Sequence, residues 1–205
     1  RHGLVGGIAY MDARFDDARL AITLMRTLFD HGGLALNYLP VKALRHHQGI
    51  VSGAGAQDAE SGESFAIEAG VVINAAGLFG DRVEGLVRPS PFSICPRKGQ
   101  FVVFDKEAAR LVRAIILPVP TERTKGVVLF RTISGNLAIG PTAEETDERE
   151  AGACESATLE RLKQLAIDMV PDLAGIGVNA IYAGLRPATE HKDYVIEALA
   201  DKGWI

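Results

Sequence analysis

The sequence predicts an α/β fold with an α+β portion. A continuous apolar strand at 71–74 runs through the small residues 75–77 into a helix that opens at Gly80-Asp81. Open α/β sheets use such a connection to bring backbone close to a ligand, although a plain strand–helix turn also needs small residues. After a linker at 88–91, short strand-like segments follow one another, which is typical of an antiparallel sheet.

Bulk composition restricts the class of protein. The 205 residues, 47% of them hydrophobic, suffice for one large or two small domains with a proper core. The net charge of -4, with Lys and Arg dispersed, argues against a nucleic-acid partner. Cys95 and Cys154 lie far apart without a Cys/His cluster, which predicts reduced cytosolic thiols. No apolar run approaches the roughly 20 residues of a membrane span, and no signal peptide is visible.

Strands and one helix are predicted before residue 70. The helix opens at Asp16-Asp17, whose carboxylates suit a helix N-terminus, and stops at 31–33, His-Gly-Gly. One face carries apolar side chains at three- and four-residue spacings: Leu20, Ala21, Leu24, Met25 and Leu28. Short strands are expected at 4–10 and 34–38. An antiparallel meander with tight turns is expected over residues 41–47, 50–58 and 63–69.

The second half is predicted to hold a largely antiparallel sheet and one helix. Its strands are expected at 93–104, 114–118, 127–132 and 137–139, with a hairpin turn at 134–136. The acidic stretch 144–150 lacks an ordered ligand spacing and is expected to be a solvated loop. A helix over 156–170 stops at Pro171 and buries one apolar face: Leu159, Leu162, Leu165, Ala166 and Met169.

The stretch AGLRPATEHKDYVIE is the strongest candidate for a binding site. An apolar strand at 176–185 is expected to end at Arg186, followed by a polar turn with His191 and Lys192 and a short strand at 194–197. A guanidinium grips a carboxylate or phosphate with two hydrogen bonds, and a lysine adds a point charge. On these residues alone, an ordinary surface turn is the favoured interpretation.

Other motifs are weaker. PRKGQ at 96–100 sets two cations beside a glycine, which lets backbone approach a ring or an anion; a bulge on an edge strand is the alternative. Gly53-Ala54-Gly55 begins a GxGxxG fingerprint, but Asp58 replaces its third glycine. The sequence contains no GxSxG, HExxH or P-loop, and its five histidines form no metal-ligand pattern.

Several stretches, in chain order, resemble one family. GGIAYMDARFDDARL, ALNYLPV and AQDAESGESFAIEAGVVINAAGLFGDRV are similar to the middle of the flavin-dependent glycerol-3-phosphate dehydrogenases. PRKGQFVVFDK, SGNLAIGPTAEETDE and AGLRPATEHKDYVIE resemble their substrate-binding portion. The wider group is the D-amino-acid-oxidase-like FAD oxidoreductases, and the resemblance covers nearly the whole chain.

The resemblance implies FAD as cofactor and two domains. These are a partial FAD/NAD(P)-binding (Rossmann-like) domain at 1–89 and a mostly antiparallel-sheet substrate-binding domain at 90–205, with which residues 1–15 are able to pair. Family members begin with a strand–GxGxxG–helix unit and close with a glycine-rich segment under the flavin. These parts would precede Arg1 and follow Ile205. We therefore expect a central fragment with an incomplete flavin site and no turnover of its own.

The same resemblance implies a role for individual residues. The backbone of Val41 is expected to approach the adenine end of FAD. Two further groups are expected to contact the cofactor: Asn74, Ala75, Ala76 and Gly77 along the adenosine side, and Lys98, Gly99 and Gln100 near the flavin ring. Arg186 is expected to clamp the substrate anion. Lys192 stands where relatives carry a phosphate-binding cation, and His191 is the candidate base, with a solvated turn histidine as its alternative.

The implied activity is oxidation of sn-glycerol 3-phosphate to dihydroxyacetone phosphate. Hydride would pass to flavin N5, and electrons onward to a quinone or another acceptor. Substrate alternatives within the family are 2-hydroxyacids such as 2-hydroxyglutarate, and amino acids; a non-catalytic ligand-binding module is the alternative of another class. The expected partners are a small anionic substrate and an electron acceptor, without nucleic acid or metal. The expected location is the cytoplasm, and peripheral contact with the inner face of the membrane and a homodimer are compatible with the sequence.

Overall fold

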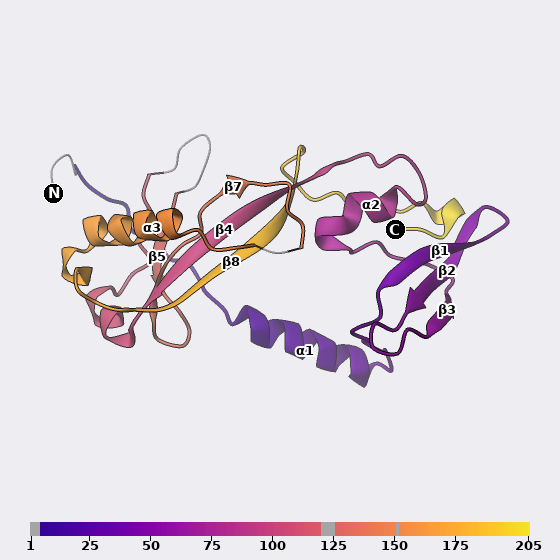
Figure 1. The fold of residues 1–205 in the computed structure, drawn as a ribbon, viewed down its shortest axis with the longest axis horizontal. Coiled ribbons are helices and arrows are strands. Elements are labelled where there is room, and N and C mark those ends of the chain that lie inside the picture. Colours follow the sequence, from indigo (N-terminus) through magenta and orange to yellow (C-terminus); the bar gives the residue numbers. More distant parts are fainter. Residues whose placement is uncertain (1–4, 120–125, 151) are drawn as a thin grey trace. The chain divides into compact units, whose positions relative to one another are not determined.

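The computed structural model describes residues 5–119, 126–150 and 152–205. The chain forms two compact units, Arg1–Ala35 and Leu36–Ile205, which we describe separately. Both helices and strands are present, and the strands form two antiparallel sheets (Figure 1). No helix in the described part of the chain is long and apolar enough to cross a membrane.

The first unit contains helix α1, Asp17–Asp30, as predicted. Asp16 caps it, because its Oδ1 accepts a hydrogen bond of 2.9 Å from the amide of Arg19. His31 and the left-handed Gly32 (φ 79°) end the helix. The predicted apolar face is present, but no residue of this fully described helix is buried. The strand predicted at 4–10 was wrong, since described residues 5–10 form no strand.

The second unit begins with the predicted meander, which is confirmed. Its strands are β1 (Val41–His47), β2 (Ile50–Gln57) and β3 (Ser64–Glu68), paired antiparallel in the order β1-β2-β3. The β1–β2 turn has positive φ at Gln48 (51°) and Gly49 (82°), which matches the twist of a two-residue hairpin. The strand predicted at 34–38 was wrong; the segment bends at Tyr38, whose φ is 54°.

Gly53 explains the incomplete fingerprint noted in the sequence. It lies within β2 with φ 148°, and a Cβ at this position would come within 1.9 Å of the Ile67 carbonyl oxygen on β3. The glycine is therefore required by the close approach of two strands rather than by a nucleotide.

Residues 71–74, predicted to be a strand, form only an isolated bridge and neighbouring backbone hydrogen bonds. Val72 makes a parallel bridge with Trp204, and the amide of Asn74 donates to the carbonyl of Ile205 over 2.7 Å. A 3₁₀ turn (Gly77–Phe79) and helix α2 (Gly80–Glu84) follow, so the predicted strand–helix connection is present. Helix α2 ends at Glu84 rather than near residue 87, because the chain continues in hydrogen-bonded turns.

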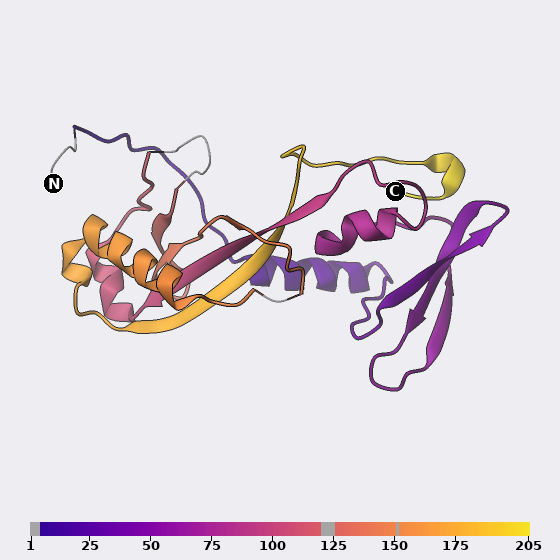
Figure 2. The same cartoon turned by 45° about the horizontal axis from the view of Figure 1, so that its top comes forward.

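The larger sheet is built around β4, Ile94–Phe104. The other strands are β5 (Val128–Arg131), β6 (Leu137–Gly140), β7 (Glu144–Glu145) and β8 (Val178–Thr189), in the order β5-β6-β4-β7 with β8 on the other side of β4. β4 and β8 run side by side along their full length (Figures 1 and 2). The sequence PRKGQ thus lies in a central strand, and the alternative of a bulge on an edge strand is not found there.

Strand β8 passes through the predicted stop at Arg186-Pro187. Pro187 lies opposite Pro96, whose carbonyl accepts a hydrogen bond from the Thr146 amide on the side away from β8. The two prolines are therefore a non-hydrogen-bonded pair, and their missing N–H groups interrupt no bond between β4 and β8.

Two further predicted strands are also absent. Residues 114–118 contribute only an isolated bridge between Ile116 and Leu129. Residues 194–197 form no strand, and Tyr194 there is 93% exposed.

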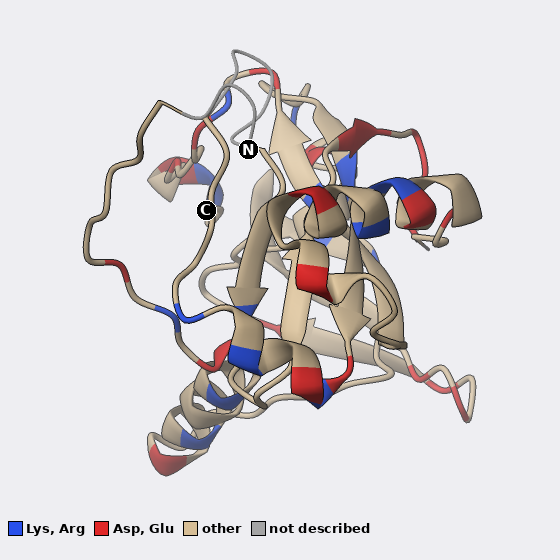
Figure 3. Ribbon diagram, turned by 90° about the vertical axis from the view of Figure 1, so that its left-hand side faces the viewer, with Lys and Arg blue, Asp and Glu red and all other residues tan. Residues whose placement is uncertain are grey.

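Helix α3, Ser156–Met169, packs on one face of β4 and forms the core, as predicted. Leu162 and Ala166 are fully buried, while the other three predicted positions are partly buried against the same core. Positive and negative residues are interspersed along the helix (Figure 3). Even-numbered residues of β4, such as Val102 and Phe104, point into this core, so the odd-numbered residues face the other way.

An ion pair joins α2 to the segment after β7, and both partners are hydrogen-bonded to Ile94 at the beginning of β4. Arg149 donates from Nη1 to Asp81 Oδ1 (2.7 Å) and from Nη2 to Asp81 Oδ2 (2.9 Å), and Nη2 also donates to the Ile94 carbonyl. Asp81 Oδ2 accepts from the Ile94 amide. The hydrogen bonds from Arg149 lower the pKa of Asp81 to about 2. The acidic stretch 144–150, predicted to be a solvated loop, instead begins with strand β7 and is anchored through Arg149.

Replacement of Leu162 by alanine is expected to lower the free energy of unfolding by about 2–5 kcal/mol, because the side chain is completely buried. The matched control is Leu86→Ala, at a position that is 52% exposed, where the loss should stay below about 1 kcal/mol. Denaturant unfolding measures both. Equal losses would contradict the assignment of the core.

The Asp81–Arg149 pair is expected to make stability depend on acid pH. The folded pKa of Asp81 lies below its ordinary 3.8, so its stabilisation is present above about pH 4 and is lost as the pH falls toward 2. Asp81→Asn should cost about 2–3 kcal/mol at pH 7, and the difference from the native protein should shrink below pH 4. Unfolding measured from pH 2 to 7 tests this, with the exposed Asp172→Asn as control. If the difference in unfolding free energy between Asp81→Asn and the native protein did not change with pH, this role of the ion pair would be refuted.

Candidate functional site

Three pairs of residues face each other across β4 and β8 on the side away from the core. Arg97 lies opposite Arg186, Gly99 opposite Gly184, and Phe101 opposite Tyr182. Since side chains alternate along a strand, all three pairs share one face. They line a pocket of about 230 Å³, to which Pro141, Thr142 and Leu185 also contribute. We call this surface the β4–β8 face.

The β4–β8 face has chemically distinct ends. Phe101 and Tyr182 stack at one end, with ring centroids 4.6 Å apart and planes 14° apart. In the middle, a Cβ on Gly99 would come within 2.9 Å of Pro141 Cβ, whereas a Cβ on Gly184 would meet no atom within 4 Å. Gly99 therefore makes room for Pro141, and Gly184 leaves open space between the rings and the arginines.

The arginine end carries an excess of positive charge. Arg97 Nη2 lies 3.4 Å from Glu145 Oε1, but the Glu145 side chain is 80% exposed, so the pair is weak. Among the residues that the structure describes, no ion pair is found for Arg186, which is exposed. A carboxylate or phosphate at this end would meet two guanidinium groups.

Lys98 and Gln100 lie on the opposite face from Arg186. Lys98 Nζ is hydrogen-bonded to Glu155 and lies 3.8 Å from Glu144 Oε2, and the hydrogen bond with Glu155 raises the pKa of Lys98. Gln100 is fully buried; its Nε2 donates to Glu144 Oε2 (3.0 Å) and its Oε1 accepts from the Glu155 amide (2.7 Å). Of the predicted trio at 98–100, only Gly99 lines the pocket with Arg186.

His191 and Lys192 lie in the turn after β8, and neither is among the described residues that line the pocket. His191 Nε2 lies 3.3 Å from the Pro91 carbonyl and 3.7 Å from Glu190 Oε1. Lys192 is exposed and has a positive φ of 57°. The structure thus places Arg97 directly opposite Arg186 in the same pocket, and the sequence offered Arg97 only as part of a weak motif.

The residues predicted along the adenosine side form an ordered loop. Asn74 Nδ2 donates to the Gly80 carbonyl (2.9 Å), and Asn74 Oδ1 accepts from the Ala76 amide (3.3 Å). Ala75, Ala76 and Gly77 are exposed, and a Cβ on Gly77 would meet no atom within 4 Å. Small side chains at the carboxyl end of a parallel pairing fit a dinucleotide that approaches the backbone. Val41 lies at the start of β1 and is 53% exposed.

Glu84 holds this loop, a role that sequence inspection missed. It is only 5% exposed, and it accepts hydrogen bonds from Trp204 Nε1 (2.8 Å), Arg88 Nε (2.6 Å) and Asn74 Nδ2 (3.4 Å). Burial raises its pKa, but the hydrogen bonds from Arg88, Trp204 and Asn74 outweigh burial, so the pKa is lowered overall. A single glutamate in a short helix gives no pattern by which to detect such a role.

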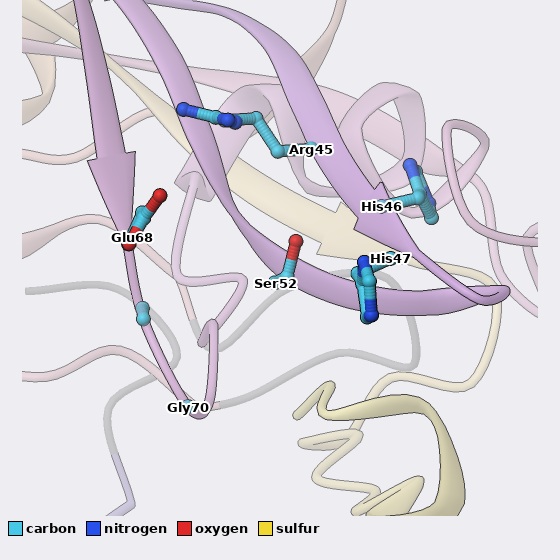
Figure 4. Close-up of a pocket in the computed structure, with 7 residues that line it drawn as sticks. Arg45, His46, His47, Ser52, Glu68 and Gly70 are labelled. Atoms are coloured by element: carbon cyan, nitrogen blue, oxygen red, sulfur yellow. The ribbon is translucent and has the colours of Figure 1, made fainter.

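A second pocket, of about 550 Å³, lies on the meander. Its lining includes Arg45, His46, His47, Ser52 and Glu68, drawn from three strands (Figure 4). His46 and His47 point away from each other, so the two imidazoles do not converge on one ligand position. Within the described part of the chain, no group of three or more His, Cys, Asp or Glu residues could hold a metal ion.

Comparisons with known proteins agree with this architecture. The family model described as "FAD dependent oxidoreductase" matches residues 1–205. A glycerol 3-phosphate dehydrogenase of Caloramator mitchellensis is 36% identical over 135 residues, which is 65% of this chain and 28% of that protein. Glycerol-3-phosphate dehydrogenase 2 of Mycobacterium bovis is 31% identical over 193 residues, 91% of this chain and 32% of that protein.

Solved structures show the same fold. The glycerol-3-phosphate dehydrogenase of Bacillus halodurans, complexed with FAD, superposes with a TM-score of 0.78 at 27% identity, over 93% of this chain and 38% of that one. The chain spans about a third of the length of these relatives. Together with the mixed helices and antiparallel sheets, the comparisons confirm the predicted fold class. The chain belongs to the family of FAD-dependent oxidoreductases.

Proposed function

We propose that this chain is part of an enzyme that oxidises sn-glycerol 3-phosphate to dihydroxyacetone phosphate with FAD, and that it supplies the substrate-binding site and part of the FAD site. The two curated relatives named above are glycerol-3-phosphate dehydrogenases, and the Bacillus halodurans enzyme of the same name was crystallised with FAD. The observation that carries the proposal is the exposed guanidinium of Arg186 in the pocket on the β4–β8 face.

Arg186 binds the phosphate of the substrate in this proposal. A guanidinium presents two parallel N–H donors to a phosphate, which fixes orientation as well as position. The open space over Gly184 then takes the carbon chain, with the stacked rings at the far end. Fixing the carbinol carbon in one place removes much of the entropic barrier to reaction.

Bound FAD would supply the acceptor for the hydride of the carbinol carbon. For its ring we propose the β4–β8 face at Gly99, with Lys98 and Gln100 contributing backbone, because their side chains point into the opposite face. For the adenosine side we propose the loop Asn74, Ala75, Ala76 and Gly77, the last three of which are exposed, together with the backbone of Val41.

His191 and Lys192 remain proposals for the base and for a second phosphate contact. Both are exposed in the turn that directly follows β8, a few residues beyond Arg186. A base must reach the substrate hydroxyl to take its proton. Their placement outside the pocket makes Arg186 the better supported contact of the three.

As the electron acceptor of the enzyme we propose a quinone or another acceptor. Cytoplasmic location, with contact at the inner face of the membrane, would bring the enzyme to a quinone.

Replacement of Arg186 by alanine in the enzyme that contains this chain is expected to raise KM for glycerol 3-phosphate by about 10- to 100-fold, because a charge-assisted bidentate contact is lost. Arg186→Lys is the matched control, and it should recover part of the loss because it keeps the charge without the fork. Steady-state kinetics on the FAD-loaded enzyme measure this. An unchanged KM in the alanine variant would refute the clamp.

A further inference from the structure

Arg97 and Arg186 are two like charges placed directly opposite each other across an antiparallel strand pair. Cβ atoms in such a pair lie about 4.5–5.5 Å apart, and like charges there destabilise a sheet. The arginine pair is therefore a cost to stability that a bound anion would relieve.

The surroundings do not remove this repulsion. Glu145 on β7 lies 3.4 Å from Arg97 but is 80% exposed, and a pair in that setting is worth little. The other two glutamates nearby, Glu144 and Glu155, are on the opposite face, where they contact Lys98 and Gln100. The net charge at the arginine end of the pocket is therefore close to +2.

We infer that Arg97 is a second anion-binding residue, and that the arginine pair makes the pocket select doubly charged phosphate esters over singly charged carboxylates. One guanidinium satisfies the two oxygens of a carboxylate, whereas a phosphate monoester offers three oxygens and nearly two negative charges at pH 7. Arg97 adds the donors and the charge that the third oxygen requires. This inference deepens the proposed function and rests on it.

The test is direct binding of two probes to the FAD-loaded enzyme, measured by calorimetry: methyl phosphate as the dianion and acetate as the monoanion. Neither probe can be oxidised, so binding is read without turnover. In Arg97→Ala, methyl phosphate affinity at pH 7.5 is expected to fall about 10- to 100-fold, and acetate affinity by less than about threefold. Arg97→Lys should recover most of the methyl phosphate affinity.

A pH series separates charge recognition from a structural role. The second ionisation of a phosphate monoester lies near pH 6, so methyl phosphate should bind the native enzyme more weakly at pH 5.5 than at 7.5. The alanine variant should show a flatter profile. Charged or titratable groups facing Arg97 are Glu145, Arg186 and, on its own strand, Cys95, and both proteins share them. The difference between the two profiles therefore isolates Arg97.

Each outcome decides one question. Methyl phosphate binding within about twofold of native in Arg97→Ala, or an equal loss for acetate, would overturn the inference. Thermal unfolding is the folding control, and removal of Arg97 should not lower the midpoint because the like-charge contact disappears. If the native enzyme binds methyl phosphate but does not oxidise glycerol 3-phosphate, the proposed reaction fails while the role of Arg97 stands.

Discussion

The pairing of β4 with β8 decides where every side chain of the site points. Their register runs without a break from Ile94 opposite Thr189 to Val103 opposite Ala180. Because the side-chain period in a strand is two, a slip of one residue would exchange the two faces. The buried contacts of Val102 and Phe104 hold the register, so the hydrophobic core fixes the geometry of a polar surface.

Neighbours in sequence consequently meet opposite environments. Arg97 and Lys98 are both cations, yet Lys98 is neutralised by two glutamates while Arg97 faces another arginine. The fully buried Gln100 joins the two glutamates through its amide, which satisfies polar groups that would otherwise be costly inside the protein. The acidic groups that would neutralise the arginine pair are thus engaged on the far side of the strand.

The sequence was most informative where a regular spacing of apolar residues extends over several helical turns, or where tight turns separate successive strands. The apolar spacing of α1 and α3 and the turns of the meander were enough to place those elements within a residue or two. Arg186 was identified, but its strand was predicted to stop there, since nothing local shows that Pro187 lies in a non-hydrogen-bonded position opposite another proline. The Arg149–Asp81 pair joins positions 68 residues apart, and only the folded topology brings them together.

Glu84 has a consequence beyond positioning one side chain. Its carboxylate binds the indole of Trp204 and the amide of Asn74, and the backbone of the same two segments is joined in parallel. Segments that share a buried acceptor and a set of backbone hydrogen bonds open together rather than one at a time. The loop proposed for the adenosine side and the segment around Trp204 therefore form one cooperative unit, whose amide protons would share one opening free energy in hydrogen exchange.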